Sequence, residues 1–101
     1  MRMMMHVTYP HEVFNAAVRD GSIGAKMKRI LDQLKPEAAY YTASGGRRSA
    51  FLIVDLADPS KIPSLCEPWF LTFNADIELS PVMTGQDLAA AGLEGLGKAW
   101  G

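Results

Sequence analysis

The sequence predicts an α+β domain whose elements follow one another as β-α-β-β-α-β, which is the ferredoxin-like order. Three observations predict it. Residues 37–56 form two β-type runs joined by a Ser-Gly-Gly-Arg turn, a helical segment lies on each side of this hairpin, and each helical segment is flanked by a further strand-like run. Two β-α-β halves of this kind form a four-stranded antiparallel sheet with helices on one face.

The first strand is expected from about Met3 to Tyr9. Within it, Met3, Met5 and Val7 face one way and the residues between them face the other. Pro10 ends the strand, because proline cannot continue a paired ladder inside a sheet.

Residues 10–34 carry two apolar stripes at helical spacing, one before Arg19 and one after Ser22. Gly21 and Gly24 would each cost about 1 kcal/mol relative to alanine inside a helix. We therefore expect a break near Gly21, with Ser22 capping the second helix. Pro36 ends that helix, because the residue before a proline is steered out of the α region.

Residues 50–54 (AFLIV) form a continuous apolar run in the second strand of the hairpin. An antiparallel strand with one wet face should alternate, so a continuous run implies that both faces are covered. The helices can cover one face, and a second copy of the same sheet is the simplest cover for the other. We therefore expect a homodimer in which two sheets stack as a dimeric α+β barrel.

The second half of the fold begins at Asp58-Pro59, where an aspartate cap precedes proline at the first helical position. Pro63 and Pro68 predict a turn followed by a short helix, not one long regular helix. Asn74 is a suitable left-handed exit from this helix. The last main strand is expected over residues 75–83.

The C-terminal residues predict a further helix. Residues 84–87 (TGQD) resemble a capping box with aspartate in place of the usual Glu or Gln. The helix after it, from Leu88 to about Leu96, is weakened by three glycines. Trp100 needs a surface to lie on, either in its own domain or on a partner.

Length and composition limit the function classes. A chain of 101 residues is expected to form a single domain, residues 1–101, and 49% apolar against 21% charged residues is typical of globular proteins. A net charge of −1 without a basic stripe argues against nucleic-acid and anionic-membrane partners. The single cysteine, Cys66, cannot form an intramolecular disulfide, which favours a cytoplasmic location.

The chain resembles an uncharacterised bacterial family of about this length from about Phe14 onward, in four blocks: KPEAAYYT, GGRRSAFLIVDLADPSKIP, EPWFLTFNADIEL and PVMTGQDLAAAGL. That family is placed with the small dimeric α+β-barrel proteins, so the resemblance implies a ferredoxin-like dimer. The wider barrel class resembles muconolactone isomerases, cofactor-free monooxygenases of the antibiotic-biosynthesis type and chlorite-dismutase-like haem proteins. A shared fold does not by itself carry their activities.

His6, Asp76 and Glu78 are the candidate catalytic residues. If the face that carries His6 lines a barrel cleft, its neutral imidazole can act as a general base near neutral pH. Asp76 and Glu78 lie two apart in a strand and share a face, where two carboxylates in a poorly hydrated space would hold protons more tightly than in water. For His6, the alternative is a structural histidine whose nitrogen atoms are hydrogen-bonded within the protein. For Asp76 and Glu78, the alternative is a charged edge strand that discourages unwanted strand pairing.

Tyr40, Tyr41, Arg48 and Trp69 are the candidate ligand-binding residues. The two tyrosines point to opposite faces, so only one can line a cleft, and core packing is the alternative. Arg48 lies shortly after a glycine pair that resembles a phosphate-binding loop. Because these glycines turn a hairpin and do not begin a helix, the remaining hypothesis is a contact between an anion and an arginine side chain. Trp69 belongs to an EPWF segment whose simpler interpretation is core packing.

Together these features predict a homodimer that binds a small, largely apolar molecule in a cleft by the sheet. Two alternatives remain open: a small cofactor-free enzyme of the isomerase or monooxygenase type, and a structural or assembly subunit without a ligand. No metal or cofactor is expected, because the two histidines lack the spacing of convergent ligands and no cysteine pair is present.

Overall fold

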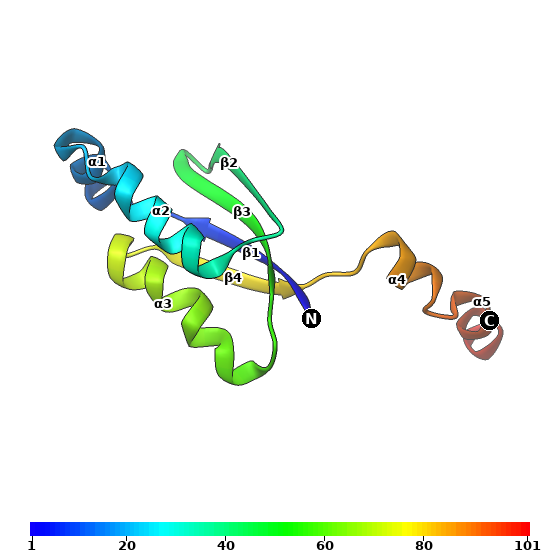
Figure 1. The fold of residues 1–101 in the computed structure, drawn as a ribbon. Helices are drawn as coiled ribbons and strands as arrows, with labels where there is room; N and C mark the ends of the chain where they lie inside the picture. The colour runs from blue at the N-terminus through cyan, green and yellow to red at the C-terminus, as the bar shows by residue number, and fades with distance from the viewer.

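The computed structural model describes residues 1–101 and contains a four-stranded antiparallel sheet with three helices packed on one of its faces (Figure 1). In chain order the elements are β1 (Arg2–Thr8), α1 (His11–Asp20), α2 (Ile23–Leu34), β2 (Ala38–Ser44), β3 (Arg47–Asp55), a 3-10 turn (Pro59–Lys61), α3 (Ile62–Phe73), β4 (Asp76–Pro81), α4 (Gly85–Ala89) and α5 (Leu93–Trp100). The strands lie in the order β2-β3-β1-β4, and every neighbouring pair is antiparallel. The predicted ferredoxin-like arrangement is confirmed. None of the helices combines the length and the apolar character needed to cross a membrane.

The hairpin between β2 and β3 fixes the register of these two strands. Gly45 and Gly46 occupy its turn with φ angles of 61° and 77°. Two consecutive positive φ angles define the tight turn that matches strand twist, and glycine adopts them without steric cost. The turn pairs Ser44 with Arg47, and the same register pairs Tyr40 with Phe51.

The core lies between the sheet and helices α1, α2 and α3. Alternate residues of β1 and β3 point into it, and α3 contributes its largest side chains. Trp69 and Phe73 are fully buried and pack edge-on against Tyr9, with ring centroids 6.0 and 5.3 Å away. The buried cluster comprises Met3, Met5, Val7, Tyr9, Ile30, Ala50, Leu52, Val54, Leu56, Leu65, Cys66, Trp69, Phe73 and Ala75.

The predicted break between the first two helices is confirmed, but the predicted cap is wrong. Gly21 ends α1 with a φ of 81°. Ser22 occupies the N-cap position of α2, yet its side chain makes no capping hydrogen bond. A cap requires extended backbone, whereas Ser22 already has helical angles (φ −84°, ψ −9°). Instead, the Ser22 N–H donates to the Asp20 carboxylate over 2.8 Å.

The prediction of a turn followed by a helix is confirmed, but the expectation that Pro63 and Pro68 shorten that helix is wrong. After the turn that Asp58 caps, α3 runs without interruption from Ile62 to Phe73, with Pro68 inside it. Pro63 lies in the first turn, where its missing N–H has no helical partner in any case. Pro68 removes one interior hydrogen bond. The buried stripe of α3 is large enough to outweigh that loss, and Asn74 then ends the helix in the predicted left-handed conformation (φ 52°).

Residues 82–101, which we call the C-terminal arm, extend away from the sheet (Figure 1). The predicted capping box is confirmed, because the Asp87 N–H donates to the Thr84 hydroxyl and the Thr84 N–H donates to the Asp87 carboxylate. The single helix predicted after it is wrong. Gly92, with a φ of 73°, separates α4 from α5.

Candidate functional site

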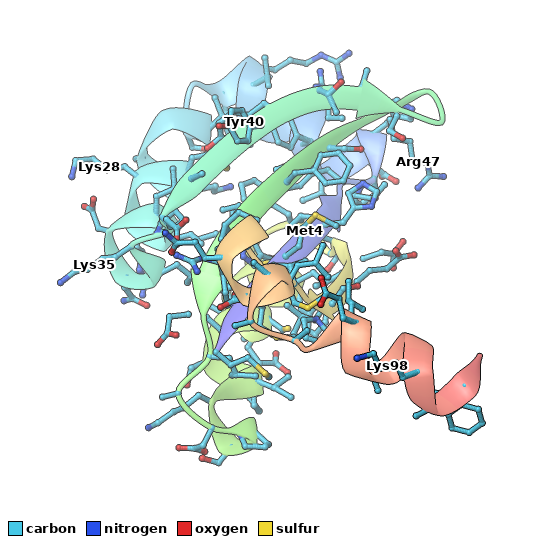
Figure 2. All side chains as sticks on the ribbon, turned by 90° about the vertical axis from the view of Figure 1, so that its right-hand side faces the viewer. Met4, Lys28, Lys35, Tyr40, Arg47 and Lys98 are labelled. Atoms are coloured by element: carbon cyan, nitrogen blue, oxygen red, sulfur yellow. The ribbon has the colours of Figure 1, made fainter.

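One face of the sheet is not covered by helices, and we call it the open face. Figure 2 looks onto this face, with Met4 and Tyr40 labelled on it. The alternation of each strand places on it those residues that are out of phase with the core. They are Ala38, Tyr40, Thr42 and Ser44 of β2, Arg47, Ser49, Phe51, Ile53 and Asp55 of β3, Arg2, Met4, His6 and Thr8 of β1, and Asp76, Glu78 and Ser80 of β4.

A row of four side chains crosses the open face, one from each strand. Tyr40 pairs with Phe51, Phe51 pairs with His6, and His6 pairs with Glu78. Directly opposed side chains on antiparallel strands have Cβ atoms about 4.5–5.5 Å apart. The sheet therefore places three of the predicted site residues, Tyr40, His6 and Glu78, along one line with Phe51 between the first two.

His6 lies near the middle of this row, on the inner strand β1. Its imidazole stacks on the Phe51 ring, with centroids 4.2 Å apart and the planes 9° from parallel. Its Nε2 atom is shielded from solvent and has no hydrogen-bond partner within the chain. A buried polar atom of this kind costs about 1–3 kcal/mol unless a partner is supplied. The Nε2 atom of His6 lacks such a partner within the chain.

Asp76 and Glu78 share the open face, as their spacing predicts, and both are exposed at the edge strand β4. Glu78 stands opposite His6, and Asp76 stands opposite Thr8 at the end of the ladder. Glu78 is therefore the carboxylate placed to interact with the imidazole. The edge position of β4 also fits the alternative of a charged strand that discourages pairing.

The other predicted ligand residues lie away from the open face. Tyr41 points to the opposite side of β2 from Tyr40 and remains exposed. The Arg48 guanidinium donates to Asn15 Oδ1 over 2.7 Å and lies 4.6 Å from the centroid of the Phe14 ring, so it joins β3 to α1. Trp69 is in the core. Ligand contacts by these residues stay predictions, and the open face does not depend on them.

The grooves of the single chain also lie elsewhere. One, of about 510 Å³, runs between α2 and α3 beside Arg29, Glu67 and Leu71. Another, of about 410 Å³, lies beside Arg2 and Glu37, which form an exposed ion pair over 2.8 Å. Neither groove includes a residue of the row. The open face is thus a surface that becomes an enclosed space only when something covers it.

Sequence reasoning did not single out Phe51 or Tyr9. The hairpin turn was a usable signal for Phe51, because a turn at Gly45-Gly46 already pairs it with Tyr40. Tyr9 has its hydroxyl buried without a partner, and burial raises the pKa of that phenol, with the charge of Tyr41 adding a smaller effect. The residue lies under α1 and α3, on the opposite side of the sheet from His6.

Cys66 provides a direct test of the packing on the helix side of the sheet. It is only 6% exposed, and burial raises the pKa of its thiol, with the nearby charge of Glu67 adding to the effect. Both factors lower the thiolate fraction. We expect the native thiol to react with dithionitrobenzoate about 100-fold or more slowly than the urea-unfolded chain, because reaction requires local opening. Equal reaction rates for the native and the unfolded chain would show that α3 does not shield Cys66. The Cys66→Ser variant, which has no thiol, gives the background signal.

Comparison with known proteins places the chain with a domain family. A family model described as a domain of unknown function (DUF3303) matches residues 1–96, which includes the whole sheet and all but the end of the C-terminal arm. No curated protein matches the chain.

Proposed function

We propose that this chain, which belongs to the DUF3303 family, forms a homodimeric α+β barrel that binds a small, largely apolar molecule over the open face of its sheet. One observation carries the proposal. The open face holds a stacked His6–Phe51 pair whose imidazole Nε2 is buried and has no partner.

The composition of the open face supports a dimer. Its inner strands β1 and β3 carry Met4, Phe51 and Ile53 beside His6, and the carboxylates of Asp76 and Glu78 lie on the edge strand β4. An apolar patch with a polar rim is typical of an interaction surface. Two sheets stack face to face about 10 Å apart, which leaves room for side chains and, where these are short, for a ligand.

The row across the open face supports a ligand. Binding pockets are lined mostly by apolar and aromatic groups, with a small number of polar atoms that orient the molecule. Tyr40 and Phe51 offer aromatic surface, and His6 offers the polar atom. A ligand with one hydrogen-bonding group would satisfy the Nε2 atom and offset its burial.

A fluorescent apolar probe tests this proposal. N-phenyl-1-naphthylamine should become fluorescent on the wild-type dimer, and Phe51→Ala should weaken its binding about tenfold, since an aromatic contact of this size contributes about 1.5 kcal/mol. Tyr41→Ala is the matched control, because Tyr41 lies in the same hairpin on the other face.

Light scattering on the same samples shows whether each variant is still a dimer. A wild-type dimer that does not increase the fluorescence of the probe would contradict the ligand proposal. It would favour the role of a structural subunit. Equal losses with Phe51→Ala and Tyr41→Ala would mean that the probe binds elsewhere.

The His6–Glu78 pair favours a second candidate, a cofactor-free enzyme of the isomerase type. A carboxylate beside an imidazole can orient it and stabilise its protonated form. In such a reaction, His6 Nε2 takes a proton from a carbon next to a carbonyl and returns it to another carbon of the same molecule. The proton balance closes without an added reactant.

This candidate predicts proton exchange on a bound carbon acid. The wild-type protein should accelerate deuterium exchange into 2-tetralone, an apolar ketone, as followed by loss of its C–H signals in the proton NMR spectrum. His6→Gln should abolish the acceleration while the naphthylamine probe still binds, and Glu78→Gln should reduce it about 10- to 100-fold. Exchange no faster than in buffer would remove the enzyme candidate and leave binding.

A further inference from the structure

The shape of the molecule sets the C-terminal arm apart. The chain extends 59 × 28 × 19 Å and has a radius of gyration of 17.0 Å, against about 13 Å for a compact chain of this length. The arm accounts for the excess, because α4 and α5 project beyond every other element (Figure 1). Neither helix contains a buried residue.

The arm carries an apolar stripe. Leu93, Leu96 and Trp100 recur along α5 at the spacing of a single helix face, and Trp100 is 88% exposed. A helix of eight residues is marginal in water, and Gly95 and Gly97 each cost about 1 kcal/mol more than alanine would. The stripe therefore requires a surface to cover it.

The direction of the arm identifies that surface. The Val82 N–H donates to the Arg2 carbonyl at the end of the sheet, and the capping box then starts α4 after a connection of only three residues. In Figure 1 the helices α1, α2 and α3 lie to the left of the strands and the arm extends to the right. Figure 2, viewed from that right-hand side, shows α4 in front of the lower part of the sheet and α5 beyond its lower right edge. The arm thus leads away from its own domain, on the side where a stacked second copy would lie.

We propose that each C-terminal arm crosses to the second copy of the chain and packs its Leu93–Leu96–Trp100 stripe at the margin of that copy's open face. This inference rests on the proposed dimer. The apolar stripe of the arm, which nothing in its own chain covers, is then buried against the second copy beside the stacked sheets. The exchange adds area to the interface and closes an open end of the space between the sheets.

A photo-crosslinker in place of Trp100 tests the exchange in the full chain. Benzoylphenylalanine is introduced at this position, and unlabelled and nitrogen-15-labelled protein are unfolded, mixed in equal amounts and refolded together. After irradiation, mass spectrometry identifies crosslinked peptides. Pairs that join a light to a heavy peptide are expected, because the arm contacts the other copy.

Other outcomes would overturn the inference in distinguishable ways. Crosslinks only within one isotope class would show that the arm folds back onto its own sheet. A dimer by light scattering without crosslinks would show an arm free in solvent, with the proposed dimer intact. A monomer by light scattering would remove the proposed dimer and the exchange together.

A pair of substitutions in α5 gives an independent measurement. Leu96→Asp should raise the dimer dissociation constant about tenfold or more, since it places a charge in the stripe. Lys98→Asp changes the charge off the stripe and should leave the dissociation constant within about twofold. Equal effects of the two substitutions would contradict the exchange. The sheet and helices α1–α3 should remain folded in both variants, because the arm contributes no residue to the core.

Discussion

Trp69→Ala is expected to lower the free energy of unfolding by about 3–5 kcal/mol, a large share of the stability of a small domain. Trp69 is fully buried and packs against Tyr9 and Phe73, with ring centroids 6.0 and 6.4 Å away. Truncating a core aromatic to alanine costs about 3–5 kcal/mol, and small domains are stable by only about 5–15 kcal/mol. The free energy of unfolding is measured by urea titration, followed by far-ultraviolet circular dichroism.

Leu71→Ala on the same helix is the matched control. Leu71 is 81% exposed, so its truncation should change the free energy of unfolding by less than about 0.5 kcal/mol. The comparison also separates the two predicted roles of Trp69. If Trp69 served mainly as a ligand contact, its truncation would reduce probe binding and leave stability within about 1 kcal/mol of wild type.

Features of the fold that depend on local chemistry could be predicted from the sequence. A proline ends β1, two glycines form the hairpin turn, and a side-chain oxygen at Asp58 and at Thr84 caps the helix that follows. Each of these signals acts within about four residues. The effect of each signal therefore does not depend on tertiary contacts, and the sequence alone predicts it.

The wrong predictions concern positions where tertiary packing or backbone geometry determines the local structure. Pro68 opposes helix locally, but the buried side chains on either side of it hold α3 together. Ser22 is a good capping residue, but it has helical backbone angles after the turn at Gly21, and the Asp20 carboxylate accepts the N–H of Ser22. Three glycines weaken the C-terminal helix, and nothing in the sequence distinguishes Gly92 as the one that adopts a positive φ.

The candidate site was predictable in part. The alternation of side chains along a strand places His6 on the opposite face of the sheet from Met5. It also places Asp76 and Glu78 on one shared face. This alternation does not give the register between β1 and its neighbouring strands, because whole helices separate β1 from them in the sequence. The stacking of His6 on Phe51 and the pairing of His6 with Glu78 depend on that register, so neither could be derived from sequence spacing.

Ile53→Lys is expected to dissociate the proposed dimer. Ile53 lies on the open face of the inner strand β3, paired with Met4, and away from the row that carries His6. In a stacked dimer, the two-fold axis would place an unpaired lysine charge from each copy in the sheet-to-sheet contact. Burying an unpaired charge costs several kcal/mol, so the dissociation constant should rise at least about 100-fold. Sedimentation equilibrium across a range of micromolar concentrations measures it.

Leu71→Lys makes a similar change on the exposed surface of α3, behind the sheet, and should leave the dimer intact. Both variants should keep wild-type circular dichroism, because neither position belongs to the buried core. A dimer that survives Ile53→Lys but not Leu71→Lys would mean that the copies meet through helices. The continuous AFLIV run would then need another explanation, since its outward side chains, Phe51 and Ile53, would face solvent in the assembled protein.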